Sequence, residues 1–160
     1  ISSGISKKEY LNHLNKSSRD HSRTTMQWSV SPQGGFSNGN NNWFLSNPNS
    51  ASINVKSDMN NDNSIFHFYR KLIGIRKQSK DLIYGDYVDL DPNHPNIFIY
   101  QRVGNKMTYL IILNMSNSPL TYNFNNLTEY ILEFSNRKDE PEISCNNIEL
   151  LAWDALMFKR

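Results

Sequence analysis

The run "MTYLIILNM", residues 107–115, is the strongest structural signal in this chain. In an extended strand, successive side chains point to opposite faces. Tyr109, Ile111, Leu113 and Met115 therefore share one face, and Leu110 and Ile112 share the other. A strand that is apolar on both faces is typical of the middle of a sheet whose two sides are covered. The run predicts such a strand, with packed layers above and below it.

Further strand-like runs lie on either side of this one. They are rich in β-branched and aromatic residues, and Asn, Gly, Pro and Asp separate them. Their ranges are 84–91, 97–103, 120–124, 130–134 and 149–160. Short runs at this spacing are typical of an antiparallel sandwich. We therefore predict an all-β domain over residues 81–160.

Upstream of residue 81 the periodicity is helical in two places. Residues 62–79 carry apolar side chains at helical spacing, and Asp62 or Ser64 can cap that helix. Residues 6–17 form a shorter candidate, with Ser6 as the cap and Glu9 three positions later. The intervening residues, 18–61, follow neither period. So long a connection inside a compact domain is unusual, and such connections tend to be functional.

Composition excludes several classes of function. The net charge of +2 over 160 residues gives no basis for a nucleic-acid partner. No apolar run has the length that a membrane span needs. The single Cys145 rules out an internal disulfide and fits a reducing, cytoplasmic compartment. The first residues, "ISSGISKKEY", contain no signal-peptide core and no initiator Met, which is expected of a piece of a longer chain.

The residues that usually carry catalysis are present but not assembled. Most acidic residues fall in expected turns and strand edges, where a solvated carboxylate is the ordinary interpretation. The four histidines have no metal-ligand spacing, and "QGGF" (33–36) is a turn rather than a phosphate-binding loop. We therefore expect no metal, no cofactor and no catalytic residue within this chain.

One stretch of the long connection is unusual: "SRDHSRTTMQWS", residues 18–29. Arg23 offers a planar fork of donors that suits a carboxylate or the hydroxyls of a sugar. Asp20 could hold that fork, and Trp28 or Trp43 could supply flat apolar walls of the kind that line ligand pockets. The residues alone leave a second interpretation open, in which Arg19, Asp20 and Arg23 form an ion-pair cluster that ties down a loop.

The same stretch resembles the segment R-D-N/H-A/S-R-T-P-M-Q-W-D/S of α-glucosidases in glycoside hydrolase family 13. This group includes oligo-1,6-glucosidases, isomaltases, trehalose-6-phosphate hydrolases and sucrose isomerases. The resemblance continues in order through "GGFSNGNNNWFLSNPNSASINV" (34–55), "DNSIFHFYRKLIGIRKQSKDLIYGDYVDLDP" (62–92) and "YLIILNMS" (109–116). Beyond residue 117 only a strand pattern and a loose match of "LLAWDALMFKR" remain.

The resemblance implies an α+β arrangement. Residues 1–80 would be the tail of a (β/α)8 barrel, namely the loop after strand eight and helix eight, and 81–160 the antiparallel C-terminal domain. Loops at that end of a barrel build the active site. Arg23 would then contact the substrate, with Asp20 and His21 as supports and Trp28 as packing.

The resemblance also implies what the chain would do and what it lacks. The parent enzyme would hydrolyse short α-linked glucosides with retention, using catalytic carboxylates that lie before residue 1, so this chain alone is expected to be inactive. Self-association is expected if the 62–79 helix normally packs on a barrel. Departures from the family motif are Thr25 in place of Pro, Asn42 in place of Pro, and Ala152-Trp153-Asp154 in place of Pro-Trp-Glu.

An alternative of another class stays open. The chain could be a free-standing, non-catalytic β-sandwich that binds carbohydrate or a protein partner through the aromatic residues around Trp43 and Phe44. What precedes Ile1 in the reading frame would separate the two interpretations.

Overall fold

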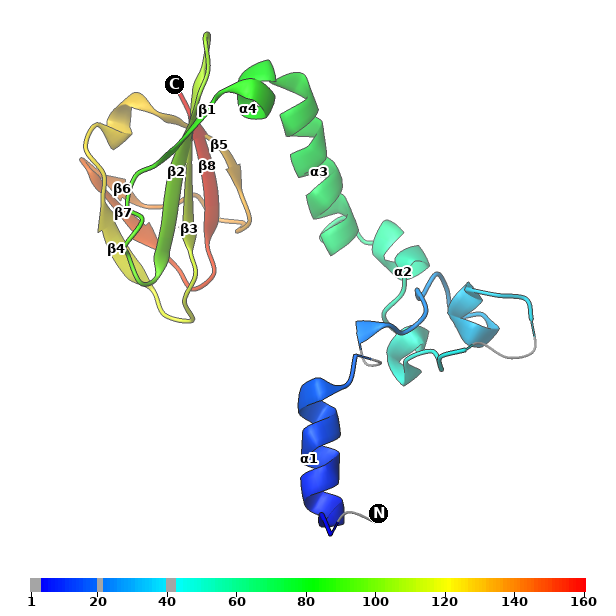
Figure 1. The fold of residues 1–160 in the computed structure, drawn as a ribbon. Helices are drawn as coiled ribbons and strands as arrows, with labels where there is room; N and C mark the ends of the chain where they lie inside the picture. Colours follow the sequence, from blue (N-terminus) through cyan, green and yellow to red (C-terminus); the bar gives the residue numbers. More distant parts are fainter. Residues whose placement is uncertain (1–3, 20–21, 40–42) are drawn as a thin grey trace. The chain divides into compact units, whose positions relative to one another are not determined.

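A computed structural model describes residues 4–19, 22–39 and 43–160. The chain divides into two compact units, Ile1–Tyr69 and Arg70–Arg160. Helices and short turns make up the first unit, and an antiparallel β-sandwich makes up most of the second (Figure 1). The helix α3, Ile65–Gln78, runs through the division between them.

The first helix, α1 (Lys7–Ser17), begins where the sequence predicts it to begin. The Ser6 hydroxyl accepts a hydrogen bond from the Glu9 amide at 3.2 Å, and the Glu9 carboxylate accepts one from the Ser6 amide at 3.0 Å. This reciprocal pair satisfies two amides that the start of a helix leaves without partners. The hydroxyl of Ser6 also donates to Glu9 and lowers the pKa of that exposed carboxyl.

The long connection, residues 18–61, contains short helical elements that its sequence does not predict. Two 3-10 turns, Pro32–Gly35 and Pro48–Ala51, precede a short helix, α2 (Val55–Met59). Helix α2 begins after Asn54 because that buried side chain accepts from the Ser57 amide at 2.9 Å. A helix of five residues is too short to show a helical period, so sequence periodicity cannot predict it.

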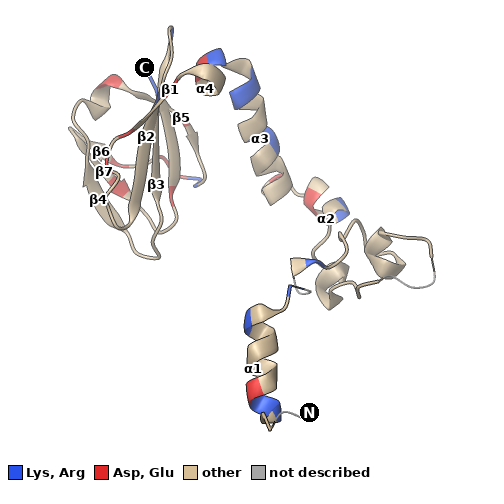
Figure 2. Cartoon of the chain, viewed as in Figure 1, with Lys and Arg blue, Asp and Glu red and all other residues tan. Residues whose placement is uncertain are grey.

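Helix α3 is confirmed, and Ser64 stands at its start: the hydroxyl accepts from the His67 amide at 3.4 Å. The basic residues of α3 lie near its middle and in its last turn (Figure 2). A further helix, α4 (Lys80–Tyr84), follows after Ser79, whose hydroxyl caps it. This helix occupies the start of the run that the sequence assigns to a strand, so the first strand begins later than expected.

The second unit contains two antiparallel sheets that form a sandwich, which confirms the predicted fold class of this part. The larger sheet has the order β1-β2-β3-β8-β5, and the smaller has the order β4-β7-β6. The strands of the larger sheet are β1 Asp86–Asp89, β2 Ile97–Val103, β3 Thr108–Asn114, β5 Ile131–Ser135 and β8 Ala155–Lys159. Those of the smaller are β4 Leu120–Asn123, β6 Ile143–Ser144 and β7 Asn147–Leu150.

Strand β3 is central and covered on both faces, as its sequence predicts. On one face Leu110 and Ile112 are fully buried in the core between the sheets. On the other face Tyr109 and Ile111 are also buried, and Ile111 lines a cavity together with Leu82 of α4. Helix α4 therefore supplies part of the second covering layer.

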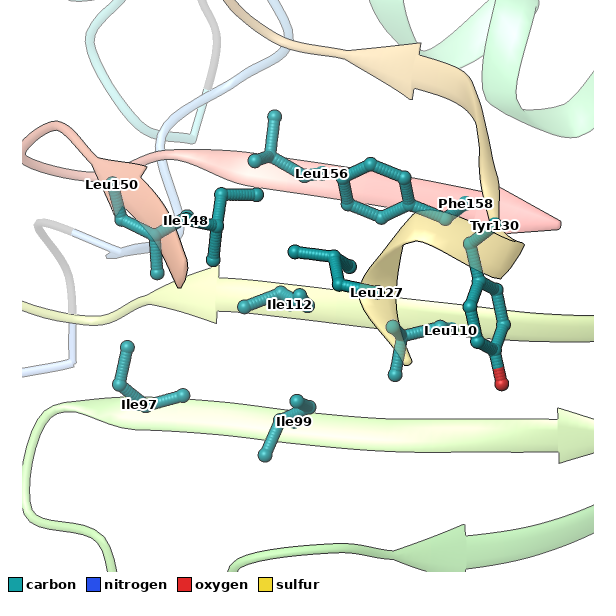
Figure 3. Close-up of a cluster of buried hydrophobic side chains, with 10 residues drawn as sticks. All are labelled: Ile97, Ile99, Leu110, Ile112, Leu127, Tyr130, Ile148, Leu150, Leu156 and Phe158. Carbon is teal, nitrogen blue, oxygen red and sulfur yellow. The ribbon is translucent and has the colours of Figure 1, made fainter. Parts of the chain in front are cut away.

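The core lies between the two sheets. Figure 3 shows its side chains pointing toward one another from β2, β3, β7, β8 and the short turn at Leu127–Glu129. Its members are Ile97, Ile99, Leu110, Ile112, Leu127, Tyr130, Ile148, Leu150, Leu156 and Phe158. Burying one such side chain fully contributes about 1.5–3 kcal/mol, so this cluster is the main source of stability in the second unit.

The last predicted strand, 149–160, is two strands joined by a turn. Strand β7 ends at Leu150 and β8 begins at Ala155. Between them Trp153 has φ 62°, and the buried Asp154 carboxylate accepts from the Leu151 amide at 2.7 Å. Asp154 also pairs with Arg137 at 3.2 Å. Hydrogen bonds to the backbone and an ion pair hold this turn, and the apolar pattern of the sequence does not predict them.

Candidate functional site

The candidate site is the described part of the unusual stretch, residues 22–28. Arg23 is exposed, and half of the surface of Met26 and of Trp28 is accessible to solvent. Asp20 and His21, which the sequence predicts as supports for Arg23, lie outside the described residues. The proposed roles of Arg23, Asp20, His21 and Trp28 stay predictions.

The backbone of this stretch is joined to the start of α2. The Val55 amide donates to the Gln27 carbonyl at 2.9 Å, and the Lys56 amide donates to the Trp28 carbonyl at 3.0 Å. The first amides of a helix have no partner within the helix. Residues 27 and 28 supply those partners, so α2 and the candidate stretch stabilise each other.

Side chains add a second connection. The amide Nε2 of Gln27 donates to Asn49 Oδ1 at 3.0 Å and also to the Ile53 carbonyl. Two positions earlier, the hydroxyl of Thr25 lies 3.2 Å from the hydroxyl of Ser46. The Thr that replaces the Pro of the family motif therefore makes a hydrogen bond that a Pro could not make.

The turn after the stretch folds the chain back onto it. The amides of Trp28 and Ser29 both donate to the Gly34 carbonyl, at 2.7 and 3.0 Å. Gly34 and Gly35 have φ of 66° and 69°, a region that favours glycine. A Cβ on Gly35 would lie 2.6 Å from the Ser29 hydroxyl oxygen, so close an approach also requires glycine. The "QGGF" segment is a turn, as predicted.

Carboxylates with clear partners elsewhere serve the fold. Asp91 accepts from the Tyr122 hydroxyl at 3.1 Å, Glu129 pairs with Arg160 at 2.7 Å, and Asp154 closes the turn described above. Within residues 4–19, 22–39 and 43–160, no group of three or more His, Cys, Asp or Glu is arranged to hold a metal ion. The described helices include none that is long and apolar enough to cross a membrane.

The second unit contains a cavity of about 480 Å³ whose lining includes Tyr87, Phe98 and Tyr100. Arg76 and Arg102 also line it, but their guanidinium groups donate to the Leu82 and Ile83 carbonyls of α4. Burial raises the pKa of Tyr100, and the two positive charges oppose that shift. Arg102 of β2 thus fastens α4 to the sheet, and Arg76 fastens α4 to α3.

Comparison with known proteins identifies the context of the candidate stretch. The family described as alpha amylase, catalytic domain, matches residues 2–85, which is more than half of the 160 residues. This chain belongs to the α-amylase family, glycoside hydrolase family 13. The match begins before the candidate stretch and ends at the first strand of the sandwich.

Relatives in the α-amylase family align with two thirds or more of this chain. It is 32% identical over 158 residues to an oligo-1,6-glucosidase of Halalkalibacterium halodurans, covering 97% of this chain and 28% of that protein. It is 43% identical over 108 residues to the trehalose-6-phosphate hydrolase of Escherichia coli, covering 68% of this chain and 19% of that protein. The chain thus spans less than a third of the length of these relatives.

Solved structures of the α-amylase family agree. The trehalulose synthase of Pseudomonas mesoacidophila matches with a TM-score of 0.84 and 28% identity, over 99% of this chain and 29% of that one. The fold class predicted from sequence, the end of a (β/α)8 barrel followed by an antiparallel sandwich, is confirmed by these family relationships. The predicted resemblance to the α-glucosidase group is confirmed as well.

Sequence reasoning singled out Arg23 but missed the residues that hold its loop. Gln27 and Asn49 both lie in motifs that carry the family resemblance, "MQW" and "NPN". Their side chains meet across 22 residues of sequence. The motifs indicate that both segments belong to the family pattern. A single sequence does not indicate that their side chains form a hydrogen bond with each other.

Proposed function

We propose that this chain is the C-terminal portion of an α-glucosidase that hydrolyses short α-linked glucosides with retention of configuration. Residues 1–80 would form the tail of the catalytic barrel, and 81–160 its C-terminal β domain. The observation that carries the proposal is the match of residues 2–85 to the α-amylase catalytic domain, followed directly by the sandwich.

Within such an enzyme the loop would bind substrate rather than perform the chemistry. Retaining hydrolysis uses two carboxyl groups about 5 Å apart, one as nucleophile and one as acid and base. In this proposal the remainder of the barrel supplies both. Arg23 would donate hydrogen bonds to the terminal glucose, Asp20 and His21 would orient it, and Trp28 would pack beside it. The exposed guanidinium on a loop fixed at residues 25, 27 and 28 supports this role.

The role of Arg23 can be tested in the full-length enzyme. Arg23→Ala should raise KM and lower kcat/KM on maltose and isomaltose by at least tenfold, because a charged hydrogen bond to substrate contributes about 1.5–3 kcal/mol. Arg70→Ala, which removes an exposed arginine from α3, is the matched control and should leave both constants unchanged. Kinetics of Arg23→Ala equal to those of the wild type would remove Arg23 from the site.

The isolated chain should be inactive. We expect no release of p-nitrophenol from p-nitrophenyl α-glucoside by the pure 160-residue protein, because it lacks the catalytic pair. Turnover above a buffer blank would contradict this expectation. Tight binding of maltose to the chain alone, without turnover, would favour the alternative of a free-standing carbohydrate-binding sandwich.

We propose that the isolated chain self-associates and that its native location is the cytoplasm. Ile65, Tyr69 and Ile73 follow one another at intervals of four along α3 and are 71%, 61% and 49% exposed, which supports self-association. The free, exposed thiol of Cys145 supports a reducing compartment. Sedimentation should show a dimer or larger species that Ile73→Lys weakens. A wild-type monomer at about 100 micromolar, a concentration at which exposed apolar surface drives association, would contradict this.

A further inference from the structure

The side chain of Gln27 makes a connection that the family resemblance does not explain. Its amide nitrogen donates to two acceptors at once, Asn49 Oδ1 at 3.0 Å and the Ile53 carbonyl. Both acceptors lie in the segment that leads into α2, more than twenty residues away in sequence. A Gln amide has two N–H donors, so these two bonds use its full donor capacity.

The main chain of the same residue is fixed as well. The Gln27 carbonyl accepts from the Val55 amide at 2.9 Å, and the Trp28 carbonyl accepts from the Lys56 amide. The backbone of Gly34 also lies close, since a Cβ there would lie 3.5 Å from the Gln27 Cα. Gln27 is therefore held through its side chain, its carbonyl and a close backbone contact.

Among the described residues, none gives Arg23 a comparable restraint of its own. Its side chain is exposed, and the residues between it and Gln27 belong to no helix or strand. Ser22, next to Arg23, donates to the Arg19 carbonyl, which is a bond within its own turn. The described attachments to distant segments that lie nearest along the chain are the Thr25 hydroxyl on Ser46 and the Gln27 amide on Asn49 and Ile53. The path that locates the Arg23 Cα thus depends on these two attachments, of which Gln27 makes the larger number of bonds.

We infer that Gln27 is a positioning residue for Arg23: it fixes the substrate-binding loop against the segment that precedes α2. This inference rests on the proposed function, in which Arg23 contacts the terminal sugar. Gln27 itself does not touch the substrate. Removing the Gln27 side chain should therefore lower kcat/KM only in a protein that still contains Arg23.

A double-mutant cycle in the full-length enzyme tests this dependence. Gln27→Met keeps the length of the side chain and removes both donors. It should lower kcat/KM on isomaltose about tenfold, mainly through KM, which corresponds to about 1.4 kcal/mol. In the Arg23→Ala background the same change should alter kcat/KM less than twofold, since coupled residues give non-additive effects.

The outcomes separate the inference from the proposal beneath it. If Arg23→Ala has no effect, the proposed function fails and the inference falls with it. If Arg23→Ala is impaired but Gln27→Met is not, or if the two losses multiply in the double variant, only the positioning role is overturned. Gln33→Met is the matched control, because the Gln33 side chain donates to the Gly39 carbonyl six residues further on and not to the segment that precedes α2. A tenfold loss in this control would also overturn the inference.

A second measurement does not depend on activity. In the 160-residue chain, Gln27→Met should speed amide hydrogen exchange at Val55 and Lys56 at least fivefold, because their acceptors are the carbonyls of residues 27 and 28. Gln33→Met should leave exchange at these two amides unchanged. Equal exchange rates in Gln27→Met and wild type would show that the side chain does not hold the loop.

Discussion

Among single residues, Asn114 shows how one polar side chain can join the ends of several strands. Its amide nitrogen donates to the Ser118 and Leu151 carbonyls, both at 2.8 Å. Its amide oxygen accepts from the amide and the hydroxyl of Ser116. The side chain is 2% exposed, so it is buried with every donor and acceptor engaged. Asn114 therefore fastens the turn after β3 to the turn between β7 and β8.

Replacing Asn114 by Asp should destabilise the second unit by about 2–4 kcal/mol. The new carboxylate keeps the shape but cannot donate, and it would face two carbonyl oxygens in a buried position. Urea denaturation followed by circular dichroism measures the change. Asn125→Asp, at an exposed turn position, is the control and should change stability by less than about 0.5 kcal/mol. Similar midpoints for Asn114→Asp and the control would contradict this account.

Asn114 lies in a family motif, "ILNMS", but the sequence does not predict the hydrogen bonds of its side chain. In the sequence, Asn114 is visible only as a polar residue that interrupts the apolar run of residues 109–115. Its partners are two carbonyls from different turns, and a carbonyl carries no sequence signal. The same reason explains why Gln27 was missed: one of its acceptors is the Ile53 carbonyl.

Among elements, α4 depends on a close approach between its carboxylate and the hairpin that joins β2 to β3. Asp81 accepts from the Asn105 amide at 3.2 Å and from the Met107 amide at 3.0 Å. A Cβ on Gly104 would lie 2.2 Å from the Asp81 Cβ. A glycine at position 104 therefore allows α4 to pack against the turn between β2 and β3.

The two glycines of this region should respond oppositely to alanine. Gly104→Ala should lower the free energy of unfolding by about 1–3 kcal/mol, because the methyl group cannot fit against Asp81. Gly74→Ala should raise it by about 0.5–1 kcal/mol, since Gly74 lies inside α3 and a Cβ there meets nothing within 4 Å. Thermal melts of the two variants beside wild type measure both; shifts of the same sign would refute the argument.

Elements were predictable in proportion to their length. Helices α1 and α3 show a helical period, and strands β2 and β3 show a β-branched and aromatic composition, over seven residues or more. Helices α2 and α4 have five residues each and β6 has two, which is too few for a pattern to emerge. Their positions are set by caps and by tertiary hydrogen bonds, such as those of Asn54 and Asp81. The local sequence contains residues that can cap a helix, but it does not show at which of them a helix begins.

At the scale of the whole sandwich, Tyr122 connects the two sheets. Its hydroxyl reaches from β4 of the smaller sheet to Asp91, in the loop between β1 and β2 of the larger. The ring of His94 packs edge-on against it, with centroids 5.7 Å apart. Burial, together with the bond to Asp91 and its negative charge, raises the pKa of Tyr122 to about 12.

This shift predicts a loss of stability in alkali. Between pH 10 and 12 the unfolded chain, with an ordinary tyrosine pKa near 10, releases the Tyr122 proton while the folded chain keeps it. The free energy of unfolding therefore falls as pH rises through that window. The fall is less than about 1.4 kcal/mol per pH unit from this group, because its ring is only partly buried.

Tyr122→Phe isolates this contribution. The variant should lose less stability than wild type between pH 10 and 12, measured by urea denaturation at each pH. Some slope should remain, because burial also raises the pKa of Tyr87, Tyr100 and Tyr130. Parallel curves for wild type and variant would show that Tyr122 does not titrate abnormally.

The tie between residues 27–28 and 55–56 has a consequence for how this loop can change in evolution. Because Thr25 and Gln27 are also bonded to Ser46, Asn49 and Ile53, a change of length in the part before Ser46 would keep these attachments. Doubling the length of a flexible excursion costs only about 0.6 kcal/mol. Under the proposed function, insertions and deletions in that part could adapt the loop to different sugars while the anchored arginine keeps its contact with the first one.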